Sequence, residues 1–180
     1  MLRSPSSQSN IRRCILLAIA ALFLFGLENN AVAVADNPTP LISRAAPDFS
    51  RSDLNHGQVS LAAYRGKVVL LNFWATWCGP CLIEIPHFVA WQQAYGKRGL
   101  QVIGISMDDD AEPVRAAYQR YRLNYPVVMG DEKLGEMYGG ILGLPVTFLI
   151  DRSGKIRFMH KSGARLSRIR SEMEKLLSEH

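Results

Sequence analysis

An apolar stretch followed closely by two cysteines constrains the fold of this chain most. Residues 68–74, Val-Val-Leu-Leu-Asn-Phe-Trp, are apolar at almost every position, which is typical of a strand covered on both faces at the centre of a parallel sheet. Beyond Cys78 and Cys81, apolar residues recur at helical spacing: Leu82, Ile85 and Val89. The sequence therefore predicts a strand, a turn that carries both cysteines, and a helix that continues to about residue 95.

Further strands and helices alternate along the chain. Hydrophobic patterning predicts strands at residues 101–106, 126–129, 146–150 and 156–160. It predicts helices at residues 114–121, 133–138 and 166–177. The polar segment between Phe49 and Val59 predicts a short hairpin with its turn at residues 55–57. Together these elements indicate an α/β fold, with a mixed sheet and helices on both faces.

An acidic run precedes one of these helices. Asp108, Asp109, Asp110 and Glu112 come shortly before Pro113, and both acids and proline favour the first turn of a helix. A metal site is the alternative, but the spacing of the acids does not resemble a calcium loop. We therefore expect these acids to mark a helix start.

The N-terminal region has the pattern of a secretory signal. Arginines precede an apolar run at residues 14–27, and small residues follow it up to Ala35. Cleavage is expected after Ala33 or Ala35. The alternative is a retained membrane anchor, although the run is shorter than the ~20 residues that usually span a bilayer. Arg12-Arg13 leaves a twin-arginine export signal open.

These features divide the chain into a signal peptide at residues 1–35, a linker at residues 36–46 and one domain at residues 47–180. They predict a periplasmic or otherwise extracytoplasmic protein. The net charge of +5 would become only mildly positive after cleavage, which indicates no particular partner. Because no basic stripe with interleaved aromatic residues is present in the sequence, we do not expect nucleic-acid binding.

The cysteines point to redox chemistry. Cys14 lies in the signal, so a cleaved protein keeps only Cys78 and Cys81. Cys78 falls at the predicted helix N-terminus, where free N–H groups and the helix dipole favour a thiolate, and it is the expected nucleophile. Cys81 lies one turn further in, and we expect it to resolve the mixed disulfide.

Two other readings of the cysteine pair remain open. A zinc site needs four ligands, whereas the sequence offers one pair and scattered histidines. A structural disulfide across two residues closes a very small loop and adds little stability. We therefore expect neither a bound metal nor another cofactor.

Residues 46–177 resemble the thioredoxin-like superfamily, in particular the exported reductases of the ResA, TlpA and DsbE (CcmG) type. The resemblance is carried by residues 72–81, by Pro86 five residues after Cys81, and by residues 143–151. It implies a thioredoxin-like three-layer fold with an N-terminal hairpin and an inserted helix-strand unit at residues 110–129.

The resemblance also implies roles for residues around the cysteines. Pro145 would be a cis-proline lying against them, which leaves the backbone of Leu144 free to pair with a substrate. An ordinary proline at a strand start is the alternative. Trp77, Gly79 and Pro80 would also contact the substrate.

The base is expected at a position other than that of thioredoxin. Asn72 stands where thioredoxin has a buried acid. Glu84 matches the acid that ResA-like proteins place beneath their cysteines, so it is the candidate base for Cys81. A solvated helix carboxylate is the alternative.

Gly79-Pro80 is the dipeptide of reducing thioredoxin, whose potential is about −270 mV. We therefore expect a disulfide reductase that acts as a monomer and is recharged by a membrane electron donor of the DsbD or CcdA type. Its implied substrates are apocytochrome c, a metallochaperone or a copper-site protein. Alternatives are an oxidase or isomerase of the DsbA or DsbC kind, a non-catalytic module that binds an apo-protein or copper, and a thiol peroxidase.

Overall fold

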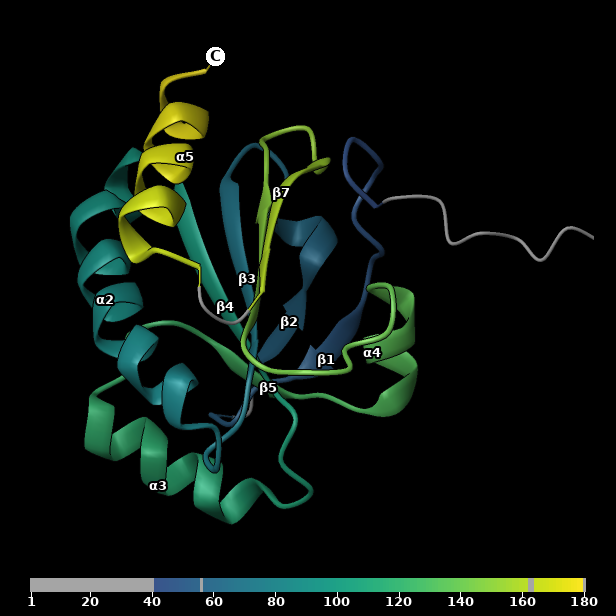
Figure 1. The fold of residues 1–180 in the computed structure, drawn as a ribbon, viewed down its shortest axis with the longest axis vertical. Coiled ribbons are helices and arrows are strands. Elements are labelled where there is room, and N and C mark those ends of the chain that lie inside the picture. The colour runs from purple at the N-terminus through teal and green to yellow at the C-terminus, as the bar shows by residue number, and fades with distance from the viewer. Residues whose placement is uncertain (1–40, 56, 162–163, 180) are drawn as a thin grey trace, which may run out of the picture. The chain divides into compact units, whose positions relative to one another are not determined.

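The computed structural model describes residues 41–55, 57–161 and 164–179, and Figure 1 shows their ribbon. The expected signal peptide or anchor at residues 1–35 lies outside these ranges, as does the first part of the expected linker. Within the described ranges, every helix is too short or too polar to cross a membrane.

A five-stranded mixed sheet forms the centre of the fold. Its order is β5-β4-β3-β6-β7. β3, β4 and β5 run parallel to one another, whereas β6 and β7 are antiparallel to their neighbours. The strands are β3 (Val68–Trp74), β4 (Leu100–Ser106), β5 (Val127–Met129), β6 (Val146–Ile150) and β7 (Ile156–Lys161). Each lies where a strand was predicted, and the expected mixed α/β architecture is confirmed.

Helices and a hairpin cover the two faces of this sheet (Figure 1). Three helices pack on one face: α2 (Gly79–Tyr95), α3 (Ala111–Tyr121) and α5 (Leu166–Ser178). The other face is covered by α4 (Glu132–Met137) and by the antiparallel pair β1 (Ser50–Ser52) and β2 (Gln58–Ser60). Two short 3-10 helices, η1 (Leu61–Tyr64) and η2 (Gly96–Arg98), were not predicted.

The alternation of side chains along β3 explains its continuous apolar sequence. Leu70 and Trp74 lie in the cluster under α2, whereas Leu71 and Phe73 lie in the cluster under α4. Phe73 packs against Tyr138, with ring centroids 5.3 Å apart. Because both faces of this central strand are buried, each position favours an apolar residue.

The expected linker requires a correction at residues 41–46. The N–H of Ser43 donates to the carbonyl of Ile156 at 2.7 Å, and the N–H of Ala46 donates to that of Gly154 at 2.9 Å. Ala46 is buried in the core. The folded part therefore begins before residue 47, because backbone pairing with the start of β7 orders a segment that has no hydrophobic period of its own.

Candidate active site

Cys78 and Cys81 form a disulfide at the head of α2, with their Cα atoms 5.3 Å apart. Cys78 is the N-cap residue, and its Sγ accepts the backbone N–H of Cys81 at 3.3 Å. Its side chain is 6% exposed and that of Cys81 is 1% exposed. Cys78 is therefore slightly more exposed than Cys81, and both belong to the buried core under α2.

The local sequence explains why α2 begins here. Pro80 occupies the first turn, where its missing N–H breaks no helical bond. The helix starts at Gly79, three residues before the first apolar residue from which it was predicted, and it continues through Pro86. The predicted position of Cys78 at the helix N-terminus is therefore found in the structure.

The end of β3 is packed closely against β4. A Cβ added to Gly104 would lie 3.0 Å from Nε1 of Trp74 and 3.2 Å from Cγ2 of Val127. Glycine at this position therefore leaves room for the indole of Trp74, which is buried in the same cluster as both cysteines. This contact supports the strand end from which the cysteine loop departs.

The loop between β3 and α2 is bound to Asp108, a site residue that the sequence did not indicate. The carboxylate of Asp108 accepts the backbone N–H of Thr76 at 3.0 Å and the hydroxyl of Ser106 at 2.7 Å. The prediction that Asp108 belongs to a helix start is wrong, because α3 begins only at Ala111. Glu112 does lie in the first turn of α3, as predicted.

Glu84 faces the interior on the same helix. Its side chain is 7% exposed, and its Oε2 is buried without a hydrogen-bond partner. Burial raises the pKa of Glu84 to about 7 from its ordinary value of 4.5, because it disfavours the charged form. The alternative of a solvated helix carboxylate is therefore wrong. Whether Glu84 acts as a base remains a prediction.

A row of polar side chains crosses the sheet beneath α2 and α5. Nδ2 of Asn72 on β3 donates to Oγ1 of Thr147 on β6 at 3.0 Å, and Thr147 stands opposite His160 on β7. Nε2 of His160 lies 2.6 Å from a carboxylate oxygen of Glu172 on α5. Asn72, in place of the acid of thioredoxin, thus has a neutral partner. The buried carboxyl of α2 is that of Glu84.

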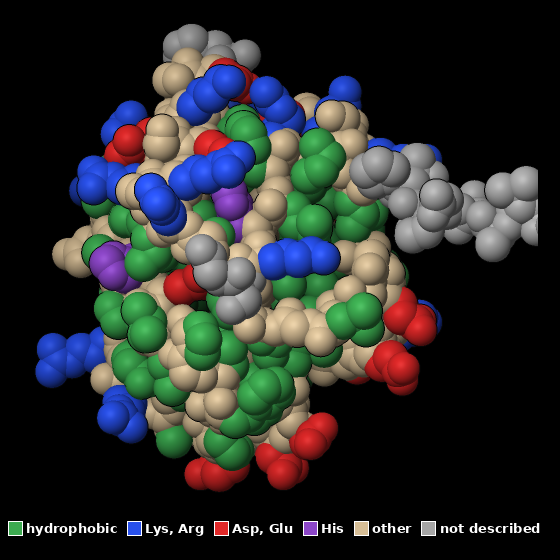
Figure 2. All heavy atoms as spheres, in the orientation of Figure 1, with side chains coloured by type: hydrophobic (Ala, Val, Ile, Leu, Met, Phe, Trp, Pro, Cys, Tyr) green, Lys and Arg blue, Asp and Glu red, His purple; other side chains and the backbone are tan. Residues whose placement is uncertain are grey.

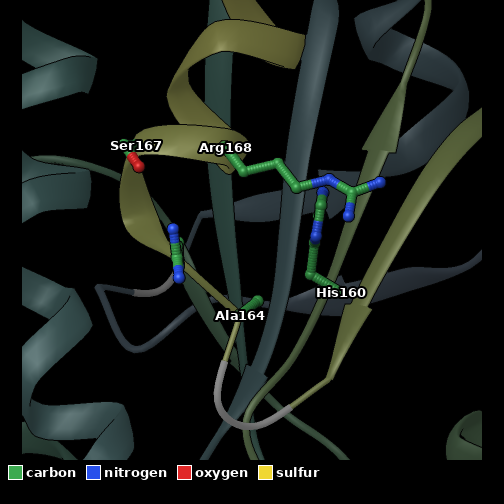
Figure 3. A pocket seen from close by; sticks show the side chains of 5 residues that line it. His160, Ala164, Ser167 and Arg168 are labelled. Atoms are coloured by element: carbon green, nitrogen blue, oxygen red, sulfur yellow. The ribbon is translucent and has the colours of Figure 1, made fainter.

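His160 also lines a hollow between β7 and α5, shown in Figure 3. The hollow has a volume of about 560 Å³, and its other lining residues are Ala164, Arg165, Ser167 and Arg168. The lining residues include neither cysteine. The hollow is therefore separate from the cysteine site.

The Leu144–Pro145 peptide bond is cis. The last paired residues of β3 and β6 are Phe73 and Val146, so Pro145 comes directly alongside the end of β3, where the cysteine loop begins. Leu144 is partly buried against the core on both faces. The structure thus brings residues 144–145 to the same edge of the sheet as the cysteines, whereas their contact with a substrate remains a prediction.

Exposed apolar side chains lie close to the cysteines in sequence. Trp77, directly before Cys78, is 70% exposed, and Ile83 and Leu142 are also exposed. On the face drawn in Figure 2, hydrophobic side chains gather in the lower half, with Asp and Glu side chains along its lower edge, while many Lys and Arg side chains lie near α5 at the upper left. A surface of this kind suits contact with another protein better than contact with a small polar molecule.

A two-cysteine motif at the junction of a buried strand and a helix, next to a parallel strand, is typical of thioredoxin-like redox proteins. Comparison with known proteins narrows this class. The family model of the AhpC/TSA family matches residues 42–159. The chain therefore belongs to the AhpC/TSA family, and its relatives identify it as a thiol-disulfide oxidoreductase of the ResA type.

Two of these relatives are thiol-disulfide oxidoreductases ResA. That of Geobacillus thermodenitrificans is 36% identical over 148 residues, which cover 79% of this chain and 80% of the relative. That of Oceanobacillus iheyensis is 31% identical over 164 residues, covering 88% and 83%. Among solved structures, a thiol:disulfide interchange protein of the thioredoxin family from Chlorobium tepidum TLS matches with a TM-score of 0.69 and 31% identity, covering 74% of this chain and 96% of that one.

Proposed function

We propose that this thiol-disulfide oxidoreductase is an exported reductase of protein disulfides, in which Cys78 attacks and Cys81 resolves. The observation that carries the proposal is the unequal placement of the two sulfurs. Cys78 is the N-cap of α2 and directly follows the exposed Trp77, whereas Cys81 is 1% exposed and has Glu84 one helical turn further along α2.

The first step uses the reduced protein. The Cys78 thiolate, stabilised by the N-terminus of α2 and the N–H of Cys81, attacks one sulfur of a partner disulfide. A bond forms between Cys78 and that sulfur, the partner's S–S bond breaks, and the second partner sulfur leaves as a thiolate.

The second step releases the partner. Cys81 gives up its proton, for which Glu84 is the proposed acceptor, and its thiolate attacks Sγ of Cys78. The Cys78–Cys81 disulfide forms, and the first partner sulfur leaves as a thiolate that takes up a proton. In total, two electrons pass from the dithiol to the partner, which becomes a dithiol.

The Cys78–Cys81 disulfide of the oxidised protein must then be reduced before another cycle. We propose that the reductant is a dithiol of a membrane electron donor of the DsbD or CcdA type, and that the protein meets its partners as a monomer. Apocytochrome c or a metallochaperone is the proposed substrate. It would lie along Trp77, Gly79 and Pro80, with its backbone beside Leu144, where the exposed apolar side chains support binding of a protein segment.

The direction of electron flow is tested by the reduction potential of the Cys78–Cys81 couple, measured by equilibration with thiol-disulfide buffers of known potential. A reductase predicts a value near that of thioredoxin, about −270 mV. A value near that of DsbA, about −120 mV, would select the oxidase instead. Retention of function by Cys78→Ser would select the non-catalytic binding module, and rapid consumption of hydroperoxide would select the peroxidase.

Export is tested by expressing the whole chain in a bacterium and fractionating the cells. We expect the protein outside the cytoplasm, with a new N-terminus after Ala33 or Ala35. An uncleaved chain in the membrane fraction would select an anchor at residues 14–27, and a cytoplasmic protein would contradict export.

The substrate is identified with Cys81→Ala in the native host. This variant lacks the resolving sulfur, so partners should accumulate as mixed disulfides on Cys78 and be released by reductant. Cys78→Ala is the matched control, and partners trapped equally by both variants would contradict the proposed order of attack.

A further inference from the structure

Asp108 connects the loop that carries Cys78 with the end of the neighbouring strand. It lies just beyond β4 and is 8% exposed. Its carboxylate accepts the backbone N–H of Thr76, at 3.0 Å to Oδ2 and 3.2 Å to Oδ1, and also the hydroxyl of Thr76. The hydroxyl of Ser106 donates to Oδ2 at 2.7 Å. One buried carboxylate thus holds both the backbone and the side chain of Thr76.

These bonds lie at the point where the chain leaves the sheet and turns into α2. Just before it, the N–H of Met107 donates to the carbonyl of Trp74 at 2.8 Å, which extends the β3–β4 pairing by one residue. Just after it, the N–H of Cys78 donates to the carbonyl of Ala75 at 3.2 Å. Thr76 lies between these two contacts, so its bonds to Asp108 determine the path of the chain toward the cysteine.

The hydrogen bond between Cys78 and Cys81 depends on the path of the chain before Cys78. Its Sγ accepts the N–H of Cys81 only while Cys78 keeps an extended backbone, with φ −89° and ψ 97°, directly before the helix. A small rotation in residues 75–77 would carry the sulfur away from the free N–H groups of α2. The stabilisation of a thiolate at a helix N-terminus falls off within the first turn, so such a displacement would weaken it.

We propose that Asp108 is a positioning residue for disulfide exchange, which holds Thr76 so that the sulfur of Cys78 stays at the N-terminus of α2. The inference rests on the proposed role of Cys78 as the attacking sulfur. Asp109 and Asp110, which follow Asp108, are exposed, and neither makes the bonds to Thr76.

Loss of the loop position and loss of the negative charge of Asp108 would shift the pKa of Cys78 in opposite directions. If the loop loosens, the thiolate loses the N–H of Cys81, and the pKa of Cys78 rises. If the only effect of Asp108 is its negative charge, removing that charge favours the thiolate, and the pKa of Cys78 falls. Variants that change one of the two without the other can therefore distinguish them.

The test uses the full-length reduced protein and the alkylation rate of Cys78 as a function of pH, with the site of alkylation assigned by peptide mass spectrometry. Asp108→Asn removes the charge and weakens the bonds. Thr76→Val keeps the charge and removes the hydroxyl donor. Thr76→Ser restores the donor. Asp109→Asn is the matched control for loss of one exposed charge.

We expect Asp108→Asn and Thr76→Val both to raise the pKa of Cys78. Below that pKa, alkylation should slow by about three- to tenfold, because one pKa unit is a tenfold change in thiolate fraction. Thr76→Ser should behave like the wild type, and so should Asp109→Asn.

A lower pKa of Cys78 in Asp108→Asn, with no change in Thr76→Val, would overturn the proposal in favour of a charge effect. Wild-type behaviour of both variants would also overturn it. If Asp108→Asn does not fold, the comparison of Thr76→Val with Thr76→Ser decides alone. Failure of the proposed function would look different, since wild-type Cys78 would then be no more reactive than Cys81.

Discussion

Glu84 lies three residues after Cys81 on the same buried side of α2, and one of its carboxyl oxygens has no hydrogen-bond partner. Burial raises the pKa of Glu84 to about 7. The carboxyl is therefore close to half protonated at neutral pH, a suitable state for exchanging a proton with a thiol. An unpartnered buried carboxyl reduces stability when it is charged, and Glu84 lies one helical turn from Cys81, the proposed resolving residue.

The pH dependence of the free energy of unfolding should show the destabilising effect of the charged Glu84. The folded-state pKa of about 7 lies above the ordinary value of 4.5, so the fold favours the protonated form. Its contribution to stability is complete below pH 4.5 and is lost as the pH rises to about 7. From linkage, Glu84→Gln should raise the free energy of unfolding at about pH 8 by up to roughly 3 kcal/mol relative to wild type, with a much smaller change at about pH 5.

Urea unfolding of the oxidised protein at both pH values measures this difference. Glu136→Gln, an exposed substitution on α4, is the control and should change little. Equal effects of Glu84→Gln at the two pH values would contradict a raised pKa.

The same substitution should slow only the second step of the reaction. Without a nearby base, Cys81 should resolve the mixed disulfide about a hundredfold more slowly at neutral pH, which is the lower end of the range for general-base catalysis. Attack by Cys78 should be unchanged. Acid quenching followed by intact-mass measurement separates the two steps, because the mixed disulfide has its own mass. An unchanged lifetime of the mixed disulfide would show that the proton goes elsewhere.

Trp77 should contribute to partner binding and little to the fold. Its side chain is 70% exposed directly before Cys78, so Trp77→Ala removes apolar contact surface without opening a cavity. We expect KM for a protein disulfide to rise about fivefold or more, as for an exposed tryptophan at an interface, with kcat and the reduction potential nearly unchanged. Met159→Ala, a half-exposed residue on β7, is the control. A matching rise in KM for a small disulfide such as that of glutathione would indicate a general defect.

The runs of apolar residues in the sequence predicted the strands of the central sheet well. β3 and β6 match the predicted residues 68–74 and 146–150 in full, because both strands are buried on both faces and read as continuous apolar runs. The apolar spacing alone marks α2 only from Leu82, since Gly79 and Pro80 lack a helical pattern, but the position of Cys78 at the helix N-terminus was predicted correctly.

Contacts between distant residues could not be predicted in this way. Asp108 looked like part of an acidic helix start, and its bonds to Thr76 join residues 32 positions apart, which no periodicity indicates. The pairing of residues 41–46 with β7 is a long-range backbone contact of the same kind. The cysteine motif was recognisable because its chemistry depends on neighbours in sequence. The contact between Asp108 and Thr76 depends instead on the pairing of β3 with β4 in the sheet.

The most direct measurement of the central claim compares single-cysteine variants after reduction. Cys81→Ala and Cys78→Ala are each mixed with one equivalent of an aromatic disulfide at neutral pH, and the adducts are followed by intact mass over time. We predict rapid formation of a mixed disulfide on Cys78 in Cys81→Ala and slow or negligible reaction of Cys81 in Cys78→Ala. Equal rates, or a faster reaction at Cys81, would contradict the assignment of Cys78 as the attacking sulfur.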